Sequence, residues 1–181
     1  MFEGKKIVVG VCGSVSAYVT AEIVDWLKKN NANVHVIMTE NAAKFVTPLT
    51  FQTVSGHHVA IDDYAVGEEW KIPHIEAASI ADVIFILPAT ATTMAKVANG
   101  VADNMVTSTV LASTCPVYFA PTMNTNMYEK PITQRNIKAL QDMGYHIIEP
   151  AEGTMICGAT GRGKMQSADY LKEYIQKVIL G

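Results

Sequence analysis

The stretch VIFIL, from Val83 to Leu87, decides the fold class because it is apolar at every position. A strand of a parallel sheet that helices cover on both faces has such a continuous apolar run. N-terminal to it, the β-branched run Ile7–Val11 leads through Gly13 into a segment whose apolar residues recur at helical spacing from Ala17 to Leu27. The chain therefore begins with a strand followed by a helix.

The same alternation continues along the chain. Strands are also predicted at 34–38, 117–120 and 145–148, and helices at 94–99, 101–112, 132–143 and 168–180. Strands that alternate with helices predict an α/β fold, here a single doubly wound Rossmann-like domain over residues 1–181 with a mostly parallel sheet. The segment 56–73 shows no clear pattern, and we expect a mobile loop there.

The amino-acid composition excludes several classes of protein. The chain has 181 residues, of which 49% are apolar, enough for one compact domain. A net charge of −3 argues against binding nucleic acid through bulk electrostatics. Charged residues make up 17%, below the usual value of about 25%, which predicts a homo-oligomer. Three cysteines without a CxxC pair argue against disulfides and zinc, and no apolar run reaches the roughly 18 residues of a membrane span, so we expect a cytoplasmic protein.

Ligands of open α/β sheets bind beyond the carboxyl ends of the strands, so the residues that follow predicted strands are the candidates for a site. The glycine-serine loop Gly10–Ala17 could bind a phosphate, or could be only a capped turn. It matches neither GxGxxG nor a P-loop, which excludes an ordinary NAD dehydrogenase. Thr39 could be a second phosphate contact, or could cap the next helix.

Three further segments carry polar groups at strand ends. Hydroxyls cluster at Thr90, Thr92 and Thr93, and Asp103 with Asn104 interrupts an apolar stretch. Asn124 follows a predicted strand, and its amide could bind a carboxylate. The glycine-rich stretch 153–165 resembles a flap that folds over a ligand, and its Cys157 is a candidate acid or nucleophile.

Histidines give a weaker signal. His74 follows Pro73 at the start of a short helical pattern and could point into a neighbouring site, although a structural role is the simpler interpretation for each of the five histidines. No spacing typical of metal ligands is present, so we expect no metal site.

Several separated motifs together resemble the homo-oligomeric flavin-containing cysteine decarboxylases, and within them the phosphopantothenoylcysteine decarboxylases. The resemblance extends from Lys5 to about Leu180. The motifs are the glycine-serine loop 13–17, the histidine followed by isoleucine at 74–75, PATATT at 88–93 for the family's PASANT, PTMNTNMY at 121–128 for PxMNxxMW, and ICG at 156–158 for the flap's ACG. Thr90 replaces serine, Thr92 replaces asparagine and Tyr128 replaces tryptophan.

The resemblance implies FMN as cofactor, with its phosphate at the glycine-serine loop and Thr39 and its ring near Ala89 to Thr93. The residues expected to bind it are Gly13, Ser14, Val15, Ser16, Thr39, Phe45, Ala89, Thr90, Ala91, Thr92, Thr93, Asp103 and Met123. Those expected to bind the substrate are Asn124, Met127, Met155, Ile156, Cys157 and Gly158.

The resemblance also implies the reaction. Oxidation of the substrate thiol to a thioaldehyde would let the cysteine carboxylate leave as carbon dioxide, and the resulting ene-thiol would be reduced to 4′-phosphopantetheine. Asn124 would bind the carboxylate, His74 would act as base or positioning group, and Cys157 would protonate the ene-thiolate. The family's sites lie between the subunits of a trimer that can assemble further into a dodecamer. A separate phosphopantothenate-cysteine ligase is also implied.

Other members of the fold are alternatives. A peptidyl-cysteine decarboxylase shares the histidine and the asparagine, whereas a flavin prenyltransferase lacks the PxMNxxM motif and the flap cysteine. A non-catalytic regulatory relative is disfavoured because the chain keeps His74, Asn124 and Cys157 and has no acidic tail.

Overall fold

A computed structural model describes residues 1–61, 72–155 and 158–181. Its central sheet has five strands in the order β2-β1-β3-β4-β5, and every pair is parallel. The strands are β1 (Lys6–Val11), β2 (Asn33–Met38), β3 (Val83–Ala89), β4 (Val117–Pro121) and β5 (His146–Ile147). The α/β class and the parallel sheet predicted from the sequence are therefore confirmed, with the VIFIL run in the middle strand.

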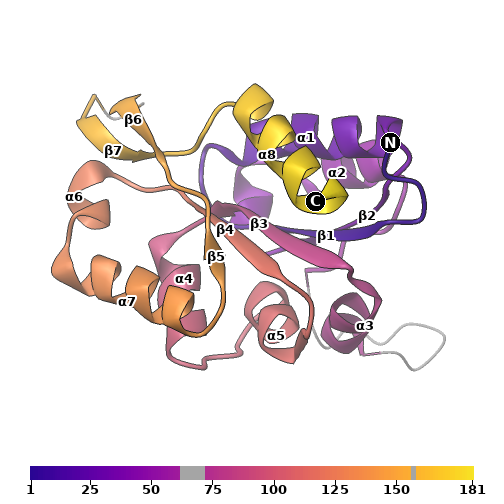
Figure 1. Ribbon diagram of the computed structural model, residues 1–181, viewed down its shortest axis with the longest axis horizontal. Helices are drawn as coiled ribbons and strands as arrows, with labels where there is room; N and C mark the ends of the chain where they lie inside the picture. The colour runs from indigo at the N-terminus through magenta and orange to yellow at the C-terminus, as the bar shows by residue number, and fades with distance from the viewer. Residues whose placement is uncertain (62–71, 156–157) are drawn as a thin grey trace.

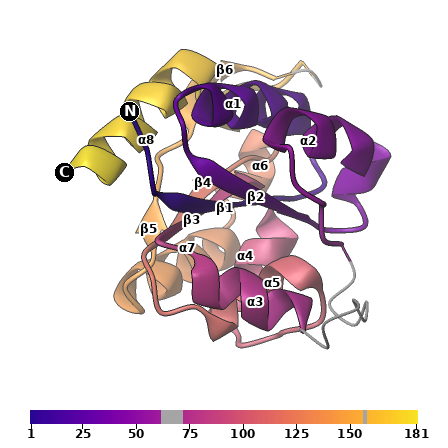
Figure 2. The ribbon, with the colours of Figure 1, turned by 90° about the vertical axis from the view of Figure 1, so that its right-hand side faces the viewer.

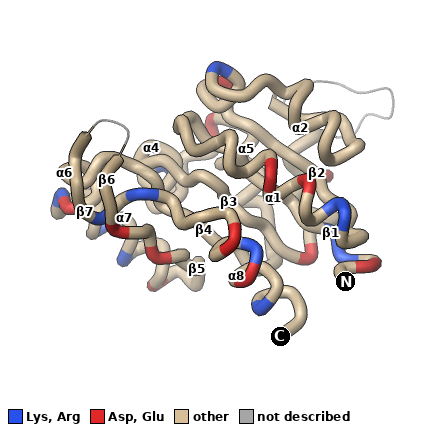
Figure 3. The backbone as a smooth tube through the Cα atoms, turned by 90° about the horizontal axis from the view of Figure 1, so that it is seen from above, with Lys and Arg blue, Asp and Glu red and all other residues tan. Residues whose placement is uncertain are grey.

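Helices cover both faces of this sheet, as Figure 1 and Figure 2 show. On one face lie α1 (Ala17–Lys29), α2 (Pro48–Ser55) and α8 (Ala168–Leu180), and on the other α3 (Pro73–Ile80), α4 (Ala91–Ala98), α5 (Met105–Ala112) and α7 (Pro131–Asp142). Side chains of β1 alternate between the two layers, since Val9 belongs to one core cluster and Val8 to the other. Each cluster anchors the helices of its own face, and the middle strand β3 between them carries no charged residue (Figure 3).

Three short elements complete the described chain. A 3-10 turn, η1, spans Ala42–Lys44, and the one-turn helix α6 spans Thr125–Tyr128. The antiparallel hairpin of β6 (Ala151–Thr154) and β7 (Thr160–Lys164) forms a separate two-stranded sheet above α6. The hairpin begins two residues before the stretch 153–165, which the sequence indicated only as a glycine-rich flap, and otherwise lies within it.

Capping residues correct two predicted helix starts. The helix predicted from Val101 begins at Met105, because the Asn104 side chain accepts the N–H groups of Val106 (3.1 Å) and Thr107 (3.2 Å). The helix predicted from residue 94 begins earlier, at residue 91, because Thr90 caps it. Helix α2 was not predicted. Of the predicted loop 56–73, residues 62–71 lie outside the described part of the chain.

In the described part of the chain, no helix is both long and apolar enough to cross a lipid bilayer.

A stacked pair of histidines makes stability depend on pH. The rings of His35 on β2 and His57 lie 4.5 Å apart, and His57 Nδ1 contacts the Val34 carbonyl oxygen at 3.0 Å. Burial, and then the charge of His57, lower the pKa of His35 below its ordinary value of 6.5. The unfolded chain therefore binds more protons below that pH, so we expect the free energy of unfolding to fall as the pH drops below about 6.5.

Chemical denaturation of the protein and of its His35→Gln variant between pH 7.5 and pH 5 measures this contribution. The variant should lose less stability over that range than the unaltered protein. Equal losses would show that His35 does not contribute.

Candidate active site

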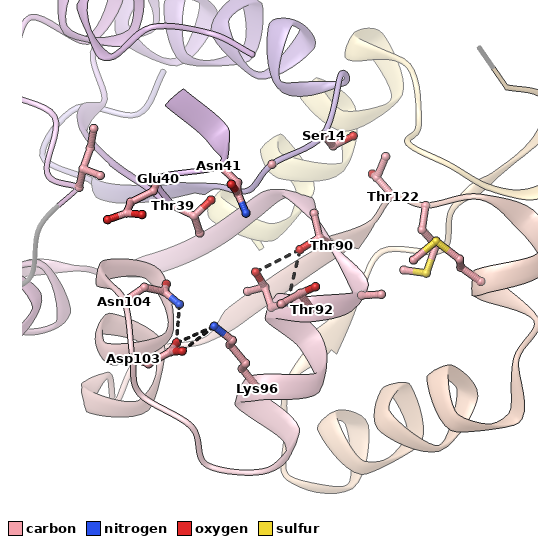
Figure 4. A pocket seen from close by; sticks show the side chains of 16 residues that line it. Ser14, Thr39, Glu40, Asn41, Thr90, Thr92, Lys96, Asp103, Asn104 and Thr122 are labelled. Carbon is pink, nitrogen blue, oxygen red and sulfur yellow. Dashed lines mark hydrogen bonds and ion pairs between the residues drawn. The ribbon is translucent and has the colours of Figure 1, made fainter. Parts of the chain in front are cut away.

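A pocket of about 740 Å³ opens at the carboxyl ends of the central strands. Strand β1 leads into α1 on one face of the sheet and β3 leads into α4 on the other, so the chain diverges between them. Ligands of doubly wound sheets bind at such a divergence, and the volume is that of a small-molecule site. The described lining residues are Gly13, Ser14, Thr39, Glu40, Asn41, Ile61, Thr90, Ala91, Thr92, Thr93, Lys96, Asp103, Asn104, Thr122, Met123 and Met127 (Figure 4).

The loop after β1 forms one wall. A Cβ atom on Gly13 would lie 2.7 Å from the Cβ of Asn41, so a side chain there would force the two strand ends apart. Ser14 lies in the pocket wall just before α1, a 13-residue helix whose N-terminus favours an anion. The glycine loop thus provides close approach of the backbone and a hydroxyl beside a helix start.

Thr39 at the end of β2 has two roles. Its Oγ1 accepts the N–H of Ala42 at 3.2 Å, which is the capping role that the sequence left open. It also lines the pocket, as the phosphate hypothesis requires.

The threonines after β3 form the floor. Thr90 Oγ1 accepts the N–H of Thr93 at 3.3 Å and lies 3.2 Å from Thr93 Oγ1, so Thr90 caps α4 at the pocket. Thr92 is exposed within the pocket wall. Beneath them the thiol of Cys12 is fully buried and hydrogen-bonded to Thr93. Burial raises its pKa to about 11, which keeps the thiol protonated and unreactive at neutral pH.

A charged cluster lines a further part of the wall. Lys96 Nζ contacts both carboxylate oxygens of Asp103, at 2.6 and 2.9 Å, and Asn104 Nδ2 donates to Asp103 Oδ1 at 2.8 Å. The hydrogen bond from Lys96 is the main cause of a lowered pKa of Asp103. The sequence indicated Asp103 and Asn104 but not Lys96, because the ion pair joins α4 to the loop before α5 and depends on how the chain turns between them.

The segment after β4 positions Asn124. The Thr122 N–H donates to the Ala89 carbonyl at 2.9 Å and the Met123 N–H to the Gly163 carbonyl at 2.9 Å, which fixes the segment between β3 and the hairpin. The Asn124 side chain accepts the N–H of Asn126 at 2.9 Å and so caps α6. Two methionines of this segment, Met123 and Met127, line the adjacent end of the pocket.

The structure brings together about half of the residues predicted from the sequence. Gly13, Ser14, Thr39, Thr90 to Thr93, Asp103, Met123 and Met127 all line the pocket. Other predicted residues do not form its described lining, namely Val15, Ser16, Phe45, Ala89, His74, Asn124, Met155 and Gly158. Ile156 and Cys157 lie outside the described residues.

His74 is the second residue of α3, which packs against α5. Its Nδ1 is buried and has no hydrogen-bond partner among the described residues. Those residues also contain no cluster of three or more histidine, cysteine or acidic side chains suited to a metal ion.

Known proteins resemble this chain over nearly its whole length. A model of the Flavoprotein family matches residues 1–180. The chain is 42% identical over 177 residues to the coenzyme A biosynthesis bifunctional protein CoaBC of Bacillus subtilis, covering 98% of this chain and 44% of that relative. It is 41% identical over 175 residues to a probable phosphopantothenoylcysteine decarboxylase of Streptococcus mutans, covering 96% and 98%. The chain thus spans less than half the length of the bifunctional relative.

Solved structures are similar over almost the whole chain. One is the FMN-dependent cysteine decarboxylase SpaF, with a TM-score of 0.83, 35% identity and coverage of 98% of this chain and 96% of the other. Another is a mutant PPC decarboxylase complexed with pantothenoylaminoethenethiol, with a TM-score of 0.89, 25% identity and coverage of 98% and 99%.

Proposed function

Because the chain belongs to the flavoprotein family, we propose that it is an FMN-dependent phosphopantothenoylcysteine decarboxylase of coenzyme A biosynthesis that acts in the cytoplasm. The observation that carries the proposal is the 41% identity to the Streptococcus mutans relative, which matches this chain over nearly the full length of both. The pocket at the strand ends supplies the matching site.

The pocket fits FMN. Gly13 permits the close approach of two strand ends, and Ser14 and Thr39 supply hydroxyls near the start of α1, where a phosphate is favoured. The backbone N–H of Val15 would add to this phosphate site, next to that of Ser16, which donates to Ser14 Oγ at 3.3 Å. The segment from Ala89 to Thr93 would lie along the ring, with Asp103 and Met123 at either side. Phe45, 54% exposed directly after η1, would shield the rim.

When bound, FMN supplies two-electron oxidation and reduction, which a cysteine carboxylate needs because its direct loss would leave an unstabilised carbanion. The protein's own groups bind and protonate the substrate. The amide of Asn124, oriented by its capping hydrogen bond, would donate to the carboxylate. Met127, Met155, Ile156 and Gly158 would surround the substrate, and Cys157 would donate a proton to the ene-thiolate.

His74 would complete the site from a neighbouring copy, as base or positioning group, in a homotrimer or a dodecamer. Two observations support an assembly with shared sites. His74 does not line the described pocket of its own chain, and its helix exposes Ile75, 48% accessible, next to Ile72, 54% accessible. Apolar side chains that are exposed in the single chain next to His74 are expected if a second copy covers them in the assembly.

Replacing Cys157 by serine tests the proton donor. We expect the Cys157→Ser variant to release carbon dioxide but to accumulate the ene-thiol instead of 4′-phosphopantetheine, because a serine hydroxyl is a much weaker acid than a thiol. Mass spectrometry separates the two products, since the ene-thiol is lighter by one H₂.

The matched control is Cys115→Ser, because Cys115 is half-buried between α5 and β4 and does not line the pocket. This variant should turn over normally. Full conversion to 4′-phosphopantetheine by Cys157→Ser would refute the assignment of Cys157.

A peptidyl-cysteine decarboxylase is the second candidate. The chain is 35% identical to the cysteine decarboxylase SpaF but 25% identical to the mutant PPC decarboxylase, although the latter has the higher TM-score. A peptide with a C-terminal cysteine is therefore the competing substrate to test.

A further inference from the structure

Lys96 is the only positively charged residue among the described residues that line the pocket. Its ammonium contacts both oxygens of Asp103, and the Asp103 N–H donates to Thr107 Oγ1 at 3.3 Å. With the hydrogen bond from Asn104, these contacts fix the carboxylate in the loop just before the N-cap of α5. The side chains of Lys96 and Asp103 remain 31% and 49% exposed, so the pair can still interact with a bound molecule.

The pair lies away from the phosphate end of the pocket. Lys96 follows the cap Thr90 by six residues, which places its Cα about 9 Å farther along the axis of α4. Its side chain leans back toward the helix start, as side chains on helices do, and so reaches the pocket. Figure 4 shows Ser14 and Lys96 on opposite sides of Thr90.

The two ends of the pocket, one with Lys96 and one with Ser14, also differ in the charge that they offer a ligand. The ammonium of Lys96 is paired with both carboxylate oxygens of Asp103, so this end of the pocket offers a phosphate no net positive charge. A phosphate dianion is better placed at the end with Ser14, which has a hydroxyl beside the start of α1. The part of FMN nearer Lys96 is therefore the ring system, which is neutral when oxidised and carries a delocalised negative charge when reduced.

Building on the proposed function, we propose that Lys96, held in place by Asp103, stabilises the negatively charged reduced flavin ring relative to the oxidised ring and so sets the reduction potential of the bound cofactor. Lys96 raises this potential through its charge, and Asp103 moderates the effect by pairing with it. The two residues therefore have opposite effects, although they belong to one ion pair.

The test is the midpoint potential of FMN bound to the purified full chain without substrate, measured against a reference dye. Lys96→Met should weaken binding of reduced relative to oxidised FMN about tenfold, which lowers a two-electron potential by about 30 mV. Asp103→Asn should raise the potential, and Lys96→Arg should keep it near that of the unaltered protein. The control is Lys138→Met, which breaks the ion pair with Asp142 on the outer face of α7.

The outcomes are distinguishable. If the unaltered protein does not bind FMN, both the proposed function and the role of Lys96 are wrong. If it binds FMN and the potentials of Lys96→Met and Asp103→Asn are unchanged, only the role of Lys96 is wrong. The role of Lys96 is also wrong if Lys96→Met weakens the binding of FMN but not of riboflavin and leaves the potential unchanged. Lys96 would then bind the phosphate and not the ring. If Lys96→Met cannot hold flavin, a raised potential in Asp103→Asn supports the proposal, and an unchanged one overturns it.

Discussion

Asn124→Asp is expected to lower turnover about a thousandfold while leaving the fold intact. Aspartate is a good helix cap, so it can still accept the N–H of Asn126 that Asn124 accepts at 2.9 Å. Its negative charge would face the substrate carboxylate. Two like charges about 4 Å apart repel by about 4 kcal/mol in a partly solvated site, or roughly three powers of ten in rate. Steady-state kinetics with FMN-saturated protein measures this loss.

Asn126→Asp makes the same exchange two residues away on an exposed side chain of α6, and we expect a change of less than about tenfold. Equal losses in the two variants would attribute the effect to general charge near the pocket. Normal turnover by Asn124→Asp would exclude Asn124 as the group that binds the carboxylate.

Gly163→Ala is expected to displace the hairpin from the site and to lower turnover about a hundredfold. A Cβ atom on Gly163 would lie 2.5 Å from the Met123 carbonyl oxygen, and its φ of +128° is one that other residues rarely adopt. Because the closest atom belongs to the backbone, the clash can be relieved only by moving β7 away from the segment that carries Asn124. Overpacking of this kind costs about 1–3 kcal/mol, so thermal unfolding should also shift downward.

Gly144→Ala separates the clash from the backbone strain. Gly144 has a φ of +90° with open space around the added Cβ atom, at the end of α7. We expect Gly144→Ala to lower stability but to keep its turnover. If both glycine variants lose turnover equally, contact between the hairpin and Met123 is not what positions the site.

The sheet could be predicted because its signal is carried by side chains. Continuous apolar runs such as Val83–Leu87 identify buried parallel strands without reference to the rest of the chain. The hairpin could not be predicted in this way, because the positions of β7 that face α6 are Gly161 and Gly163. Glycine has no side chain to show an alternating pattern, and the reason for it, contact with Thr125 and Met123, lies in another part of the sequence.

The site was predicted where strand ends carry polar groups and was missed where two elements meet. Thr90 and Thr39 follow their strands directly, so their place at the pocket follows from topology. The pairing of Lys96 with Asp103 depends on how the loop before α5 lies against α4, which the sequence pattern does not show. His74 illustrates a third case, because the resemblance assigned it a catalytic role that its position in one chain does not explain.

The most direct test of the central claim is a turnover assay followed by mass spectrometry, with purified protein, added FMN and 4′-phosphopantothenoylcysteine. Loss of carbon dioxide with formation of 4′-phosphopantetheine is the predicted result. A parallel reaction with a peptide that ends in cysteine should give much slower conversion. Decarboxylation of the peptide alone, or no conversion of either substrate by protein that has bound FMN, would contradict the proposed function.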